Sequence, residues 1–178
     1  MKTTLDSIKN NSLKKRYINT LDFVKKHIPI KSKILDLGTV NTLSNVLIEE
    51  GYKVKNTKRE DLDSDYHLYT KDNSDCITSF EIFEHMLAPY NILKNTKIKK
   101  LIASVPLRLW FANAYWNEQD DWDKHYHEFE PKQFNFLLKQ TGWNIVDSEK
   151  WVSYDNKIGI RPFLRRFTYR YYIVYCER

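Results

Sequence analysis

The chain has 178 residues, 42% of them apolar and 29% charged, a composition typical of one globular domain rather than of a disordered chain. Its 29 lysines and arginines exceed its 23 aspartates and glutamates by six, a mildly basic balance compatible with a phosphate-bearing or nucleic-acid partner. Two cysteines in apolar runs argue against a disulfide scaffold or a multi-cysteine metal site, and no apolar run reaches the roughly 18 residues of a spanning helix.

The polar start of the chain does not have the pattern of a signal peptide, so we expect a cytoplasmic protein made of a single domain, residues 1–178. Residues 1–29 are predicted as an N-terminal helical extension. Their apolar positions fall on one stripe, and Pro29 ends the helix: Leu13, Tyr17, Leu21, Val24 and Ile28.

Strands and helices then alternate along the first half of the chain. Residues 33–38 have the pattern of a short buried strand closed by a glycine, residues 42–51 that of a capped helix, and residues 52–57 that of a second strand. The polar stretch 58–74 leaves room for at most a very short strand at residues 67–69. Residues 75–80 are predicted as the next strand, and a helix follows to residue 95.

The second half begins with a strand at residues 100–105, which Pro106 ends. Residues 107–130 are rich in aromatic side chains and have no clear period, and loops of this length are usually functional. Residues 131–142 predict a helix, and residues 143–146 and 167–176 predict two strands. We expect these two strands to pair antiparallel, since no helix is predicted between them.

This order predicts an α/β fold with a mostly parallel sheet covered on both faces. The strand that ends at Leu37 is expected to lie between the strands near residues 53–57 and 75–80. The strand 167–176 is expected to run antiparallel to its neighbours.

Ligands of such sheets bind beyond the carboxyl ends of the strands. The first strand ends in a turn that could hold a ligand, made of Asp36, Gly38, Thr39, Val40 and Asn41. Ser79, Phe80 and Glu81 follow at the end of the strand 75–80, and His85 comes shortly after. Each feature alone is common in proteins without a ligand, because a strand–glycine–helix turn is generic and acidic residues complement a helix dipole.

Together, in this order, these segments resemble the class I S-adenosylmethionine-dependent methyltransferases, in the version of the small-molecule and quinone methyltransferases. The resemblance covers about residues 30–150 and rests on four segments: KILDLGTVNTLSNVLIEEGYKV, DNSDCITSFEIFEHM, KKLIASVP and HYHEFEPKQFNFLLKQTGWNIV. It implies a Rossmann-like methyltransferase fold of seven or slightly fewer strands, with an antiparallel C-terminal strand. It also implies S-adenosylmethionine as the cofactor and methyl transfer as the activity.

The sequence departs from the family pattern at two places. The family's first motif is Asp-x-Gly-x-Gly-x-Gly, whereas Val40 and Thr42 stand here at the second and third glycine positions. The acidic residue that would bind the ribose falls on or near Lys58, which cannot accept those hydrogen bonds. Asp61 or Glu60 could replace it only if the loop is shifted, and Asp72 is a candidate partner for the adenine.

The cluster from Asp120 to Glu128 contains His125 and His127 on one face of an extended segment. The resemblance implies a loop over the methyl acceptor, with His127 as the first candidate for a catalytic base, ahead of His85 and His125. A metal site built from the histidines and a carboxylate, and a solvated turn, are the alternatives, and we predict no metal.

The aromatic residues of the 107–116 segment could line an acceptor pocket or simply cover the core: Trp110, Phe111, Tyr115 and Trp116. The C-terminal arginines lie among Phe and Tyr residues, a pattern compatible with single-stranded nucleic acid but more typical of a solvated hairpin.

We therefore predict a methyltransferase acting on a small-molecule acceptor. The alternatives are a methyltransferase-like binding protein with impaired cofactor binding and an RNA-binding or RNA-modifying protein that uses the basic tail.

Overall fold

A computed structural model describes residues 3–153 and 159–178. Within them, one six-stranded sheet has the order β2-β1-β3-β4-β6-β5. The strands are β1 (Lys33–Leu37), β2 (Lys53–Asn56), β3 (Cys76–Phe80), β4 (Lys100–Pro106), β5 (Asn144–Val152) and β6 (Tyr169–Glu177).

The pairing of the strands confirms the predicted α/β class. β1 is parallel to β2 on one side and to β3 on the other, and β4 extends the parallel part beyond β3. β6 inserts antiparallel between β4 and β5. The sheet is therefore mostly parallel at one side and antiparallel at its C-terminal side, as expected.

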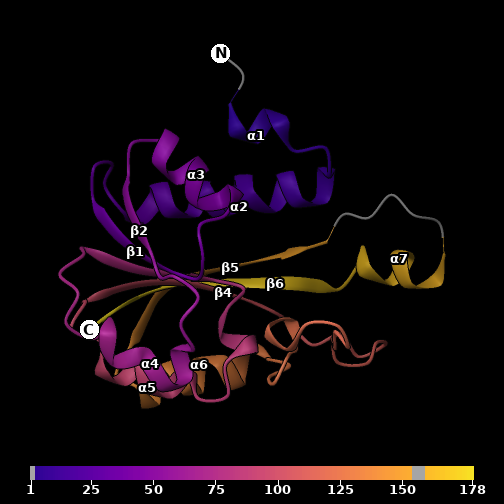
Figure 1. The fold of residues 1–178 in the computed structure, drawn as a ribbon. Helices are drawn as coiled ribbons and strands as arrows, with labels where there is room; N and C mark the ends of the chain where they lie inside the picture. The colour runs from indigo at the N-terminus through magenta and orange to yellow at the C-terminus, as the bar shows by residue number, and fades with distance from the viewer. Residues whose placement is uncertain (1–2, 154–158) are drawn as a thin grey trace.

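Helices cover both faces of the sheet (Figure 1). One layer holds α1 (Thr4–Ser7), α2 (Asn11–His27) and α3 (Thr42–Glu49), and the other holds α4 (Leu62–Asp65), α5 (Pro89–Asn95) and α6 (Pro131–Gln140). Short 3-10 turns are found at Tyr66–Leu68, Phe83–His85 and Asp121–Asp123. A further helix, α7 (Ile160–Arg165), lies apart from both layers, next to the beginning of β6. None of the helices in the described part of the chain has the length and apolar character needed to cross a membrane.

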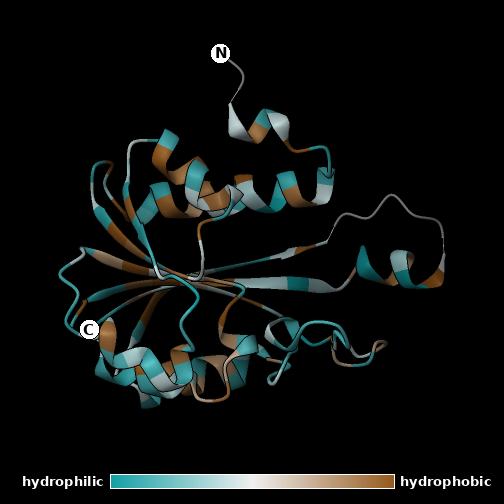
Figure 2. Cartoon of the chain, in the orientation of Figure 1, coloured by the Kyte–Doolittle hydropathy of each residue, from teal (hydrophilic) through white to brown (hydrophobic). Residues whose placement is uncertain are grey.

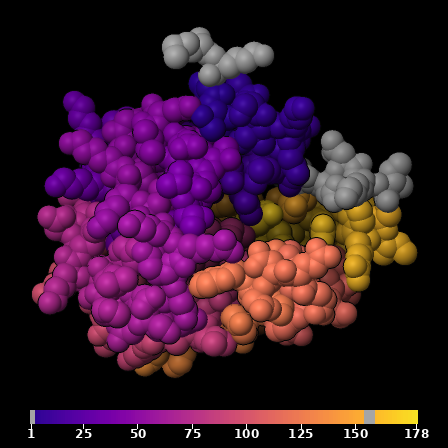
Figure 3. All heavy atoms as spheres, viewed as in Figure 1, coloured from indigo at the N-terminus to yellow at the C-terminus, as the bar shows by residue number. Residues whose placement is uncertain are grey.

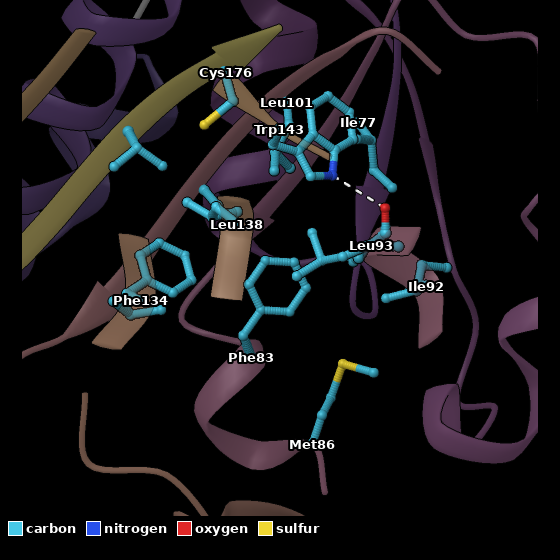
Figure 4. Packing of buried hydrophobic residues seen from close by; sticks show 14 of the residues in the cluster. Ile77, Phe83, Met86, Ile92, Leu93, Leu101, Phe134, Leu138, Trp143 and Cys176 are labelled. Atoms are coloured by element: carbon cyan, nitrogen blue, oxygen red, sulfur yellow. Dashed lines mark hydrogen bonds between the residues drawn. The ribbon is translucent and has the colours of Figure 1, made fainter. Parts of the chain in front are cut away.

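Each face of the sheet packs against its own apolar cluster, and the helices turn their hydrophobic residues toward the sheet (Figure 2). On the α2 side, Leu21, Phe23 and Val24 are buried against Ile34 and Ile102. On the other side, Trp143 lies at the centre of the cluster and its indole N–H donates to the carbonyl of Leu93, 3.0 Å away (Figure 4). That bond satisfies the one polar atom of a side chain that is only 2% exposed.

Four features of the secondary structure differ from the sequence-based expectations. Residues 67–69 do not form a strand, because the chain there continues a turn of helix that Asp61 caps through the amide of Asp63. For the same reason a short helix, α4, is present between β2 and β3. A second unexpected helix, α7, lies between β5 and β6. β5 itself continues to Val152, well beyond residue 146, because it pairs with the whole length of β6.

Asp36 joins several elements at the middle of the sheet. Its carboxylate accepts hydrogen bonds from Thr78 on β3 (2.6 Å), Asn56 on β2 (2.9 Å) and Ser44 on α3 (3.0 Å). The residue is only 2% exposed, and burial raises the pKa of its carboxyl to about 6 despite these three donors.

This raised pKa predicts a specific pH dependence of stability. The native state holds the Asp36 proton more tightly than the unfolded chain, so its contribution is present below pH 3.8 and is lost as the pH rises through about 6. Urea unfolding of the wild type and of Asp36→Asn should show their difference in unfolding free energy shrinking by about 2 kcal/mol from pH 4 to pH 7. A difference independent of pH would contradict the assignment.

Candidate functional site

A cavity of about 370 Å³ opens beyond the carboxyl ends of β1, β2 and β3. We call it the strand-end cavity. Three segments that follow these strands form most of its wall. The long loop, residues 107–130, contributes one side chain. The lining residues are Gly38, Thr39, Thr57, Lys58, Arg59, Glu60, Asp61, Leu62, Asp63, Ile82, His85, Met86 and Trp122.

Gly38 turns the chain at the end of β1 in a conformation that an L side chain rarely adopts, with φ +108°. Its N–H donates to the Thr57 hydroxyl at 2.7 Å. A Cβ at this position would lie 2.9 Å from Cδ1 of Ile82, so a larger residue would push on the cavity wall. The glycine therefore brings the backbone close to the strand-end cavity.

The other residues of the predicted turn have different positions. Thr39 lines the strand-end cavity, but Val40 is 67% exposed and does not line it. Asn41 caps α3 by accepting from the amides of Leu43 and Ser44. Asp36 is held inside the sheet by its three donors and does not reach the cavity.

Acidic side chains are present at the end of β2, although the resemblance to the methyltransferases puts Lys58 at the position of the ribose-binding acid. The Lys58 amide donates to Oε2 of Glu60 at 2.7 Å, and both residues line the strand-end cavity. Asp61 also lines it while capping α4. Asp72 lies outside this lining and forms an ion pair with Lys55 at 2.7 Å. Glu60 and Asp61, the two acids that the sequence offered in place of position 58, thus both line the strand-end cavity.

The predicted residues at the end of β3 face away from the strand-end cavity. Ser79 is fully buried, and Phe80 and Glu81 line a separate cavity with Arg16 of α2. Burial raises the pKa of the Glu81 carboxyl, which accepts from the Ser104 hydroxyl at 2.8 Å. The residues that do line the strand-end cavity here are Ile82, His85 and Met86. All three lie in the segment DNSDCITSFEIFEHM, from which the sequence singled out His85 but not Ile82 or Met86.

A second cavity, of about 260 Å³, adjoins the first, since His85 lines both. We call it the histidine cavity. Its wall combines acidic, basic and aromatic side chains from α2, the β3 end, β4, the long loop and β6: Arg16, Glu81, Glu84, His85, Pro106, Tyr115, Asp123, His125, Arg170 and Tyr171. The surface is visibly hollowed between α2, drawn indigo, and the orange loop (Figure 3).

Glu84 is the most deeply buried acid of the histidine cavity, with 1% of its surface exposed. Its Oε2 has no hydrogen-bond partner among the described residues. The pKa of its carboxyl is raised well above the usual range, mainly by burial and secondly by the negative charge of nearby Glu81. A buried oxygen of this kind is available to a ligand.

His85 and His125 meet in the same cavity, with ring centroids 4.8 Å apart. Nδ1 of His85 lies 3.1 Å from the Lys124 carbonyl, which can only accept, so in the neutral tautomer Nδ1 carries the hydrogen and Nε2 has the lone pair. Nδ1 of His125 lies 3.1 Å from Oε1 of Glu128, and the same reasoning applies to it. Both rings are therefore oriented by their Nδ1 contacts.

His127 has a different environment, which does not fit its predicted role. It is half-buried, stacks on Phe129 and places Nε2 3.4 Å from the Leu87 carbonyl. It lines none of the cavities described here, whereas His85, the lower-ranked candidate, lines two. The expected aromatic wall is present only in part: Tyr115 lines the histidine cavity, but Trp110 is 74% exposed.

Glu84, His85 and His125 are also the group that could hold a metal ion. Each offers one ligand atom, and these atoms lie within 4.8 Å of one another. The Nδ1 contacts of the two histidines are of the kind that orients metal-binding imidazoles. Arg16 and Arg170 line the same cavity, and their charges oppose a cation there.

Comparisons with known proteins agree with this geometry at the level of the fold. No protein-family model and no curated protein matches the sequence. Solved structures do match. A methyltransferase from Mesorhizobium loti has a TM-score of 0.60 and 15% identity, covering 98% of this chain and 100% of its own. One from Archaeoglobus fulgidus has a TM-score of 0.56 and 12% identity, covering 91% and 94%. Both are described as S-adenosylmethionine-dependent.

The fold is that of the class I S-adenosylmethionine-dependent methyltransferases. The predicted resemblance is thus confirmed for the architecture. The cyclase SpnF is similar to the same extent, with a TM-score of 0.58 and 12% identity, covering 96% of this chain and 85% of its own. Since that protein is described by a different reaction, the methyltransferase fold does not by itself determine what this chain does.

The environment of His125 gives a testable prediction. Burial lowers the pKa of its imidazole, and the Glu128 carboxylate partly opposes this by favouring the imidazolium. In an NMR titration the His125 pKa should lie below 6.5, and Glu128→Gln should lower it further. Glu130→Gln, at an exposed acid paired with Arg108, is the control and should leave it unchanged. A rise in Glu128→Gln would contradict the contact.

Proposed function

We propose that this protein is an S-adenosylmethionine-dependent methyltransferase, with the cofactor in the strand-end cavity and the methyl acceptor in the histidine cavity. The single observation that supports this most directly is that the two cavities adjoin at His85. A methyl group and its acceptor must meet at close range, and two neighbouring cavities with a shared wall suit that requirement.

The residues of the strand-end cavity fit the proposed cofactor. Its volume, about 370 Å³, lies within the usual range for small-molecule sites. The close backbone at Gly38 would receive the amino-acid part, the Glu60 carboxylate would accept from the ribose hydroxyls, and Ile82, Met86 and Trp122 offer apolar surface to the adenine. Lys58 contributes its backbone to orient Glu60.

When bound, S-adenosylmethionine supplies an already electrophilic methyl group. The protein's own side chains would then align the acceptor and remove its proton. The Nε2 lone pair of His85 is the proposed proton acceptor, oriented by the Nδ1 contact with Lys124. Tyr115, Tyr171 and the Glu84 carboxyl would hold the acceptor, which we propose is a small hydroxylated molecule.

The first experiment tests the cofactor. In calorimetry with S-adenosylhomocysteine, Glu60→Gln should weaken binding by about tenfold or more, because it removes a hydrogen bond to a charged group. Asp22→Asn, an exposed position on α2 that lines none of the described cavities, is the matched control. Binding that is equally strong in wild type and Glu60→Gln would contradict the role of Glu60. No binding to the wild type would favour a methyltransferase-like binding protein without the cofactor.

Lys58→Glu provides a separate check. The resemblance alone predicts that an acid at position 58 would restore a missing ribose contact and tighten cofactor binding. With Glu60 oriented by the Lys58 amide, we expect no gain in affinity. A clear gain would return the ribose site to position 58.

The second experiment tests the proton acceptor. Transfer of a labelled methyl group to a panel of hydroxylated small molecules should fall by roughly a hundredfold or more in His85→Ala. His127→Ala is the matched control: it should keep most of the activity, since His127 lines none of the described cavities. Activity lost in His127→Ala and kept in His85→Ala would restore the original sequence-based choice.

One observation favours a second form of this reaction, in which a divalent metal on Glu84, His85 and His125 binds the acceptor oxygen. That observation is the buried Oε2 of Glu84, which has no partner in the described part of the chain. Dialysis against a chelator distinguishes the two forms. Activity that is lost and then restored by added Zn²⁺ or Mn²⁺ assigns the metal form, and unchanged activity assigns the His85 form.

A further inference from the structure

The segment from Ile160 to Arg170 is strongly basic, and its first part, the helix α7, lies outside the two helical layers. It contains four arginines and no acidic residue. Its helix, α7, leads into the beginning of β6 and extends beyond both helical layers (Figure 1). Neither apolar cluster of the core includes a residue of α7. The function proposed above does not use this element.

The apolar side chains of this segment form one exposed stripe. Ile160 is 81% exposed, Phe163 58% and Phe167 75%. Their spacing of three and then four residues puts them on one face of a helix and the turn that continues it. The rings of Phe163 and Phe167 lie 5.2 Å apart, so they already pack on each other. By the same spacing Arg161 and Arg166, both exposed, flank this stripe, and Arg165 lies opposite it.

We propose that α7 is a docking surface for an anionic lipid membrane. An interfacial helix of this kind buries an apolar stripe in the lipid and pairs its basic side chains with anionic headgroups. The stripe of Ile160, Phe163 and Phe167 supplies the apolar part, and the exposed Arg161 and Arg166 beside it supply charge complementarity. The absence of acidic residues from Ile160 to Arg170 removes the repulsion that a carboxylate would meet at such a surface.

Two other partners fit this surface less well. A second copy of the chain in a two-fold contact would bring the arginines of α7 toward each other without any acid in the segment to pair with them. Single-stranded RNA is bound by stacking on aromatic rings, and Ile160, the most exposed residue of the stripe, cannot stack.

The docking surface is close to the proposed acceptor site. A fourth cavity, of about 330 Å³, is lined by Arg161 and Arg165 of α7, by Arg170, and by Tyr115 of the long loop. Arg170 and Tyr115 also line the histidine cavity. A membrane bound by α7 would therefore lie beside the entrance to that cavity. This last consequence rests on the proposed function, but the docking itself does not.

Vesicle sedimentation with the full chain tests the docking without reference to methyl transfer. The wild type should bind phosphatidylcholine vesicles that contain phosphatidylglycerol, and raising the salt concentration should weaken binding. Phe163→Ser combined with Phe167→Ser should reduce the bound fraction at least about tenfold. Arg161→Gln and Arg166→Gln should each weaken binding about fivefold.

Phe136→Ser is the matched control, because Phe136 is an equally exposed phenylalanine, 63% accessible, on α6. It should leave vesicle binding unchanged, and pure phosphatidylcholine should bind the wild type only weakly. Circular dichroism and thermal unfolding of each variant would show that the fold is kept. Absence of binding to anionic vesicles would overturn the proposal. So would self-association, or RNA binding without vesicle binding, that is lost in the same Phe163 and Phe167 variant.

Discussion

The buried carboxylate of Asp36 joins β1 to its two neighbouring strands and to α3 through three hydrogen bonds. Asn56, one of its donors, also donates to the Gly38 carbonyl at 3.2 Å, so the same network sets the shape of the turn after β1. Burying a carboxylate is costly, which the raised pKa of Asp36 reflects, and the three donors offset that cost. The strand-end cavity depends on this arrangement because its floor is the Gly38 turn.

A second anchor is the backbone carbonyl of Glu84. It accepts from the amides of both Tyr126 (2.8 Å) and His127 (3.2 Å), which ties the long loop to the end of β3. Successive amides of an extended strand point to opposite sides, so two neighbours cannot both reach one carbonyl unless the chain turns. This turn separates the two histidines: His125 enters the histidine cavity, and His127 stacks on Phe129 outside it.

The short connection between β2 and β3 gives the strand-end cavity its outer wall. β2 is the edge of the sheet in the described residues, and α4 with the loop before it lies beside the cavity. The Asp63 carboxylate accepts from the amides of Leu87 and Ala88, both at 2.7 Å, and so fixes α4 to the beginning of α5. This wall is built from polar loop residues. Position 58 is a lysine, and Glu60, two residues further along the same loop, lines the cavity instead.

The sequence by itself determined the α/β class, the neighbours of β1 and the antiparallel C-terminal strand, because hydrophobic periodicity and the order of elements constrain a sheet strongly. It also indicated the Gly38 turn and the resemblance to methyltransferases. It named Glu60 only as a substitute for position 58, ranked His127 ahead of His85, and did not indicate that α7 would stand apart from the core. These features depend on how the loops fold back onto the sheet and on which backbone groups of other elements the loop residues bind. Such contacts join residues far apart in the chain, as Glu84 and His127 are, and no local pattern records them.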